Sequence, residues 1–170
     1  MNTYTILKGL LKVAPKKDVR FAMNSVAITP TRLIATDGHQ IMAVDNTIYG
    51  VDETVIVCRA DLESKLKLFT KKEPPELTVR DGVPYLNEYK LVTIAGRYPD
   101  VNRVINTAKE NKAQTGEMGL SLGLLANLSQ AIAIAADDKM SPSLFMIKDT
   151  TTPLIIERKG IFAMLAHCRS

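Results

Sequence analysis

The sequence predicts an α+β fold in which one unit, a helix followed by antiparallel strands, is repeated three times. Apolar residues recur at helical spacing in three segments, and short apolar runs typical of β-strands follow each segment. Pairs of turn-forming residues separate these runs, with Asp37-Gly38 and Asp81-Gly82 the clearest examples. A generic α+β protein without true repeats is the alternative interpretation of the same pattern.

Residues 1–46 form the first predicted unit. Ile6, Leu10 and Val13 share one face of a helix, which Pro15 brings to an end. Turn formers at 30–31 and 37–38 then divide the chain into three predicted strands, at 19–29, 32–36 and 40–46.

The second unit opens with a predicted strand at 54–58, followed by a helix at 60–70. Leu62, Leu66 and Phe69 form the buried face of this helix, and the Lys71–Pro75 segment ends it. Three further strands are expected, at 76–80, 83–87 and 89–95.

A polar segment without apolar periodicity, 107–116, separates the second unit from the third, and we interpret it as a linker. The third unit then repeats the order of the second. It comprises a strand at 118–122, a helix from Leu124 to about Ala136, and strands near 144–148, 153–158 and 161–165.

Composition argues against a membrane protein and for a reducing compartment. The most apolar run, 120–136, is interrupted by Asn127, Ser129 and Gln130, so it is not a continuous apolar segment of the kind that spans a membrane. The N-terminus lacks a basic segment followed by an apolar one, which predicts a cytoplasmic protein. Cys58 and Cys168 match no zinc or redox-motif spacing.

The charge pattern supports contact with nucleic acid without requiring it. The net charge is +4 and the isoelectric point is about 9.1, with lysine pairs at 16–17 and 71–72. The absence of Trp, beside four Phe and five Tyr, leaves little aromatic surface for stacking single-stranded bases.

No catalytic constellation is present in the sequence. It contains no glycine-rich phosphate loop and no nucleophile elbow. The two histidines, His39 and His167, stand at opposite ends of the chain, which argues against a histidine-based metal or catalytic site. We therefore expect a protein that is not an enzyme and uses no cofactor or metal.

Two short motifs carry a resemblance to a known family. Ala35-Thr36-Asp37-Gly38-His39 and Gly96-Arg97-Tyr98-Pro99-Asp100 each follow a β-like run, about sixty residues apart. Together they resemble the middle domain of the bacterial replicative sliding clamp, the beta subunit of DNA polymerase III. The resemblance is strong over 18–44 and 90–105 and weak after 117. Within it, 18–24 is similar to the first strand of that domain.

The resemblance implies a DNA-clamp fold and a domain division. Clamp domains contain two helix-plus-strands units each, so 1–106 corresponds to a complete clamp-like domain, 107–116 to a linker and 117–170 to half a domain. Relative to the family, the first domain and the first half of the last domain are missing. The strand before the first helix is missing or reduced to residues 1–5. The hydrophobic C-terminal tail is replaced by 167–170.

In the family, partner peptides dock in an apolar groove between the middle and last domains. Met23, Ile41, Val104 and Leu165 would supply adaptable apolar walls. His39 and Arg103 would supply a polar rim, and Pro99 would fix the backbone. Carried over by position, the whole groove comprises Met23, Thr36, Gly38, His39, Gln40, Ile41, Pro99, Arg103, Val104, Pro153, Leu154, Ala163 and Leu165.

Several of these residues have a purely structural alternative. Gly38 permits the hairpin turn whether or not it also lines a groove. His39 is equally well explained as an exposed turn residue, and Pro99 as the end of a strand.

The resemblance also implies DNA contact by basic side chains on helices that face a central hole. Such contacts go to phosphates and give salt-sensitive, sequence-independent binding to duplex DNA. The third predicted helix offers Asn127, Ser129 and Gln130 but no cation. Ordinary solvated helix faces are the alternative explanation. The candidate residues are Lys8, Lys12, Lys65, Lys67, Lys71 and Lys72.

Unit counting predicts the assembly. A clamp ring holds twelve units, so three units per chain give four chains, a homotetramer with dihedral symmetry. The half domain would leave an open sheet edge, which pairing with the same unit of another chain would close. The remaining open edges are expected on the first units of each pair.

The expected function is therefore a sliding clamp, a processivity factor that encircles duplex DNA. It would tether a polymerase or other DNA enzymes through linear peptide motifs, with a clamp loader as a further candidate partner. One alternative is a clamp-like module that forms no ring and captures clamp-binding peptides as competitor or adaptor. Another is an unrelated α+β interaction domain.

Overall fold

The computed structural model describes residues 1–45, 47–48, 51–110, 120–138, 144–146, 153–158 and 160–166. The first unit contains helix α1 (Thr3–Val13), a short 3-10 helix η1 (Phe21–Met23) and strands β1 (Ser25–Ile28), β2 (Arg32–Thr36) and β3 (Gln40–Asp45). The second contains β4 (Val55–Cys58), α2 (Arg59–Leu66), β5 (Leu77–Arg80), β6 (Val83–Leu86) and β7 (Tyr89–Lys90). After α3 (Val101–Glu110), the third contains α4 (Leu122–Ala136), β8 (Leu144–Met146), β9 (Leu154–Arg158) and β10 (Ile161–Leu165).

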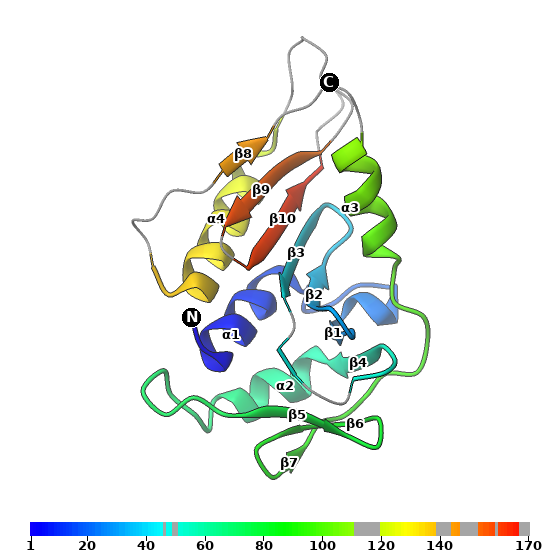
Figure 1. The fold of residues 1–170 in the computed structure, drawn as a ribbon, viewed down its shortest axis with the longest axis vertical. Helices are drawn as coiled ribbons and strands as arrows, with labels where there is room; N and C mark the ends of the chain where they lie inside the picture. The colour runs from blue at the N-terminus through cyan, green and yellow to red at the C-terminus, as the bar shows by residue number, and fades with distance from the viewer. Residues whose placement is uncertain are drawn as a thin grey trace.

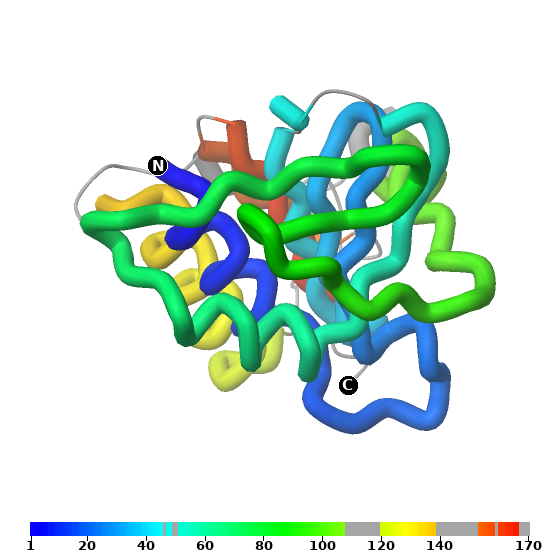
Figure 2. The backbone as a smooth tube through the Cα atoms, turned by 90° about the horizontal axis from the view of Figure 1, so that it is seen from below, coloured from blue at the N-terminus to red at the C-terminus, as the bar shows by residue number. Residues whose placement is uncertain are grey.

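The strands form two antiparallel sheets. A seven-stranded sheet has the order β4-β1-β2-β3-β10-β9-β8, and β5-β6-β7 form a three-stranded sheet. Helices α1, α2 and α4 lie together on one face of the larger sheet, whereas α3 lies on the opposite face (Figures 1 and 2). Successive strand residues point to opposite faces of the sheet, so their side chains are buried in two hydrophobic cores, one under the three helices and one under α3.

The first unit lies in the middle of this row of seven strands. Strand β1 pairs with β4 of the second unit, and β3 pairs with β10 of the third, from Gln40↔Leu165 to Val44↔Ile161. The expectation of an open edge on the first unit was wrong, because a neighbouring unit pairs with each of its sides. The outer ends of the row belong to the second and third units. The division into a complete domain and a half domain stays a prediction.

Helices α1 and α4 pack closely where the first unit meets the third. A Cβ atom on Gly9 would lie 2.6 Å from the Ala131 carbonyl oxygen and 2.7 Å from the Ala135 Cβ. The buried Thr5 hydroxyl donates to the Ala135 carbonyl over 3.1 Å. The glycine therefore permits an approach that no other residue allows without moving one helix.

Three predicted strands differ from the observed structure. Residues 18–24 form a hydrogen-bonded turn and η1 instead of a strand, because Asp18 accepts the Arg20 amide and Asn24 donates back to the Asp18 carbonyl. In the predicted strand 89–95, β7 is short, and the chain then turns so that Thr93 pairs with Val57 of β4. In the predicted strand 118–122, residues 118–119 lie outside the described residues and Leu122 begins α4.

The helices also differ in extent. Helix α4 begins two residues earlier than predicted because Ser121 caps it, accepting the Leu124 amide. Helix α2 ends at Leu66, before the predicted 70. Helix α3 was not predicted, and it includes 107–110, the start of the predicted linker; the remaining linker residues, 111–116, lie outside the described residues.

Candidate functional site

The β2–β3 turn, residues 36–41, is held by its own side chains. One carboxylate oxygen of Asp37 accepts the amides of His39 and Gln40, each over 2.8 Å. The Gly38 amide donates to the Thr36 hydroxyl over 3.0 Å, and Gly38 has a φ of 91°. The sequence folds into this turn because Asp accepts successive amides and Gly adopts a positive φ at little cost. Gly38 and His39 are exposed at its tip.

Arg20, in the turn before η1, lies directly against Gly38. Its guanidinium donates to the Asp37 carbonyl over 3.2 Å and forms an ion pair with Asp18 at 2.7 Å. The hydrogen bond from Arg20 lowers the pKa of the Asp18 carboxyl to about 2. A Cβ on Gly38 would lie 3.0 Å from Arg20 Nη1. Space and backbone conformation therefore both favour glycine here.

The third unit borders the same turn. The Ala166 amide donates to the His39 carbonyl over 2.8 Å, directly after β10 ends. Across the sheet, Gln40 pairs with Leu165 and Leu165 pairs with Leu154. The two segments carried over from the first and third units are thus neighbours in space.

Burial separates the predicted peptide-binding residues into two sets. Gly38, His39, Pro99, Arg103 and Val104 are exposed, Val104 to 43%. The others are buried or half-buried. Leu154, Ala163 and Leu165 belong to the core under the helices, whereas Ile41 packs on the opposite core, with α3. The partly or fully buried set is Met23, Thr36, Gln40, Ile41, Pro153, Leu154, Ala163 and Leu165.

The second motif leads into α3 on the face opposite the other helices. Tyr98 is buried, and its hydroxyl donates to the Ile34 carbonyl over 3.4 Å. Asp100 accepts the Arg103 amide over 3.0 Å and so caps the first turn of α3. Pro99 lines a cavity of about 320 Å³ with Thr29 and Ile34, and residues 36–41 do not line that cavity.

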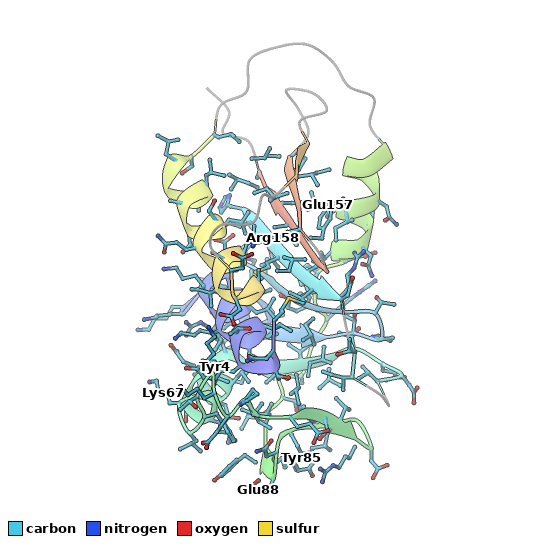
Figure 3. The ribbon with its side chains drawn as sticks, turned by 60° about the vertical axis from the view of Figure 1, so that its left-hand side comes forward. Tyr4, Lys67, Tyr85, Glu88, Glu157 and Arg158 are labelled. Carbon is cyan, nitrogen blue, oxygen red and sulfur yellow. The ribbon has the colours of Figure 1, made fainter. Side chains whose placement is uncertain are left out.

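The predicted DNA-facing lysines also fall into two sets. Lys8 and Lys12 on α1 are exposed, as are Lys67 and Lys72; Figure 3 labels Lys67 at the outer side of the helices. Lys65 instead is half-buried and bonds Asp61 over 2.8 Å, and Lys71, although exposed, bonds Asp137 over 2.5 Å. Helix α4 contains no charged residue. Helix α1 therefore provides the clearest positive surface.

A groove of about 1020 Å³ runs between α1 and α4 on their outward side. Lys8 and Tyr4 line it from α1, Ser129 and Gln130 from α4, and Thr70 from the loop after α2. The Lys8 ammonium lies 5.5 Å from the centre of the Tyr4 ring, a cation–π contact that leaves it near the groove. Sequence reasoning missed this groove because it arises from two helices over a hundred residues apart.

Two negative findings concern the described residues. Among them, no group of three or more His, Cys, Asp and Glu side chains could hold a metal ion. In the same part of the chain, no helix has the length and apolar character needed to cross a membrane.

Solved structures of sliding clamps resemble the whole chain. The DNA polymerase sliding clamp from Pseudomonas aeruginosa matches with a TM-score of 0.69 and 14% identity, over 99% of this chain and 66% of that chain. Pol III beta from Caulobacter crescentus matches with a TM-score of 0.67 and 13% identity, over 100% and 65%. The DNA polymerase III beta chain from Streptococcus pneumoniae gives a TM-score of 0.67 and 13% identity, over 99% and 64%.

No family model and no curated protein matches the sequence. The chain spans slightly less than two thirds of the length of the clamps that it resembles. At such low identity the likeness concerns the fold. The expectation of a DNA-clamp fold is confirmed, and this chain has the fold of the bacterial DNA polymerase sliding clamps.

Proposed function

We propose that this chain is a subunit of a sliding clamp, a non-catalytic protein that encircles duplex DNA and tethers DNA enzymes. The observation that carries the proposal is the match of almost the entire chain to sliding clamps, at a TM-score of 0.69. The grouping of α1, α2 and α4 on one face of the sheet supports it, because it supplies a helical surface for the DNA.

Contact with DNA would come mainly from α1. Lys8 and Lys12 are exposed there, α4 is uncharged, and Lys65 and Lys71 are already paired with carboxylates. Phosphate contacts of this kind carry no sequence information and weaken as salt rises. Weak, uniform attraction suits a protein that moves along DNA.

Partner proteins would bind at the β2–β3 turn, beside the end of β10, and along the start of α3. The start of α3 lies near the opposite end of β2 from the turn, where Asn102 accepts a hydrogen bond from Arg32 over 3.4 Å. The exposed predicted residues are Gly38 and His39 at the turn, and Pro99, Arg103 and Val104 at α3. The buried members of the predicted set would support both places from the core. Linear peptides of a polymerase or another DNA enzyme are the proposed ligands, and a clamp loader would be a further partner.

A closed ring needs several chains, because this chain spans about two thirds of one clamp chain. Three units per chain give a homotetramer, with contacts at the outer ends of the second and third units. Retention on DNA tests the proposal. The protein should remain on a nicked circular plasmid during gel filtration in high salt and should be lost after the plasmid is cut once.

One observation favours a second candidate, a clamp-like module that captures peptides without forming a ring. The helical face is only weakly charged, since α4 has no charged residue and the four charged residues of α2 cancel. This candidate predicts peptide binding but no difference between circular and linear DNA. A chain that shows neither property would contradict both candidates.

A further inference from the structure

The β2–β3 turn is tied to the third unit by a path of side-chain hydrogen bonds. Asn127 of α4 donates to Oε1 of Gln40 over 3.2 Å, and Nε2 of Gln40 donates to Oδ2 of Asp37 over 2.7 Å. The other oxygen of Asp37 accepts the amides of His39 and Gln40. A continuous path of hydrogen bonds therefore runs from α4 to the tip of the turn.

The middle residue of this path, Gln40, is buried. Gln40 is only 3% exposed, so both ends of its amide need partners within the protein. Asn127 also donates to the Lys12 carbonyl over 3.2 Å, at the end of α1. The Asn127 amide thus joins α1, α4 and the turn at a single point.

Arg20 and Gln40 bond different parts of Asp37. The Arg20 guanidinium, paired with Asp18, donates to the Asp37 carbonyl, whereas Gln40 bonds the carboxylate. His39 is exposed in the turn itself. Arg20 therefore fixes the backbone of the turn from the first unit, and Gln40 fixes its carboxylate from the side of the third unit.

We propose that Asn127 and Gln40 are positioning residues through which the third unit holds the β2–β3 turn in its peptide-binding shape. The inference rests on the proposed peptide binding at this turn. Gln40 is buried and acts through Asp37, so its contribution to a peptide site is indirect. Asn127 lies on α4, 87 residues away in sequence from Gln40 at the start of β3.

A double-mutant cycle on peptide affinity tests the path. The variants are Asn127→Leu, Gln40→Met and the double variant, which remove the hydrogen-bonding groups at nearly constant side-chain volume. The probe is a fluorescein-labelled pentapeptide, Leu-Ser-Leu-Ser-Phe, with its Kd measured by anisotropy; its apolar residues alternate with small polar ones, to match the apolar walls and polar rim of the predicted groove. Ser129→Ala, an exposed change on the same helix, is the matched control.

Each single variant should raise the Kd roughly fivefold, because each interrupts the path of hydrogen bonds to the turn. The double variant should be no weaker than Gln40→Met alone, because both changes interrupt the same path. Ser129→Ala should bind like the unchanged protein. The proposal would be overturned if the increase in Kd of the double variant equalled the product of the two single increases. An unchanged Kd in Asn127→Leu would also overturn it.

Amide hydrogen exchange separates this inference from the proposed function. If the unchanged protein binds no peptide, peptide binding fails, but exchange at His39 and Gln40 still reports on the turn. Asn127→Leu should speed exchange of these amides about tenfold relative to Ser129→Ala, without an equal change in the core strands. Equal exchange in the two variants would refute the positioning role.

Discussion

At the scale of single residues, Gly9 determines how closely the first and third units pack. A methyl group there would meet the Ala131 carbonyl oxygen at 2.6 Å. Gly9→Ala should therefore destabilise the fold, by about 1–3 kcal/mol as for other overpacked sites. Gly123→Ala is the matched control, because its nearest atom would lie 3.9 Å away, at Ser121 Oγ. That change should stabilise α4 by about 0.5–1 kcal/mol.

Urea denaturation measures both changes. Changes of opposite sign in the free energy of unfolding for Gly9→Ala and Gly123→Ala would support a close helix contact at Gly9. A stabilising effect of Gly9→Ala would show that α1 and α4 do not approach as closely as the structure indicates.

The Asp18–Arg20 pair makes a prediction on pH. The hydrogen bond from Arg20 lowers the Asp18 pKa from 3.8 to about 2. A lowered pKa in the folded state means that the pair stabilises the fold above pH 3.8, and that this contribution is lost as the pH falls towards 2. NMR titration of the Asp18 carboxyl should give the low pKa. Arg20→Ala should return it towards the ordinary value, and an unchanged midpoint would contradict the contact.

At the scale of elements, α3 presents two different faces to its surroundings. Val101 and Ile105 are buried in the core that α3 covers, at 3% and 1% exposure, whereas Val104 is exposed. Ile105→Ala should cost about 2–5 kcal/mol of stability. Val104→Ala should leave stability nearly unchanged and weaken binding of the labelled pentapeptide. Thermal denaturation and anisotropy distinguish the two. A loss of stability in Val104→Ala equal to that in Ile105→Ala would contradict this orientation.

Sequence patterns predicted elements well where local signals and packing agree. Strands β2 and β3 follow the prediction because Asp37 and Gly38 define the turn between them. The patterns failed at 18–24, where alternating apolar residues suggested a strand. There, side chains of Asp18 and Asn24 bond the local backbone, and Phe21 is 78% exposed.

Helix α3 shows a second kind of failure. Val101, Val104, Ile105 and Ala108 recur at the i, i+3, i+4 and i+7 spacing of a helix, so the signal was present in the sequence and was overlooked beside the polar residues between them. The Asp100 cap was a second available signal. Likewise, the motifs located the β2–β3 turn, but they could not show that Gln40 is buried or that Asn127 reaches it. Those facts depend on how distant segments pack.

At the scale of the whole molecule, α1 is the helix of the α1, α2 and α4 face whose charged residues are all positive. Lys8→Ala should lower the slope of log affinity for duplex DNA against log salt by about one for each chain in contact. Arg80→Ala is the matched control, since Arg80 is an exposed cation on β5, in the other sheet. Fluorescence anisotropy between low and moderate salt measures both slopes. Equal slopes would show that α1 does not face the DNA.

The proposed ring also depends on where exposed apolar residues lie. Val92, 54% exposed, belongs to the second unit, and Leu122, 79% exposed, to the third; both units are at the outer ends of the row. Val19 is more exposed than either, at 96%, but belongs to the middle unit. If copies of the chain meet end to end, charge at either end should interrupt the ring and charge in the middle should not.

Sedimentation equilibrium over a wide concentration range tests this arrangement. The unchanged chain should have the mass of four chains, and Val19→Asp should retain it. Val92→Asp and Leu122→Asp should each reduce the mass to two chains, because each leaves the contact at the other end intact. A single chain in the unchanged protein would favour the ring-free, peptide-capturing module. A tetramer that survives both end changes would place the contacts between chains elsewhere.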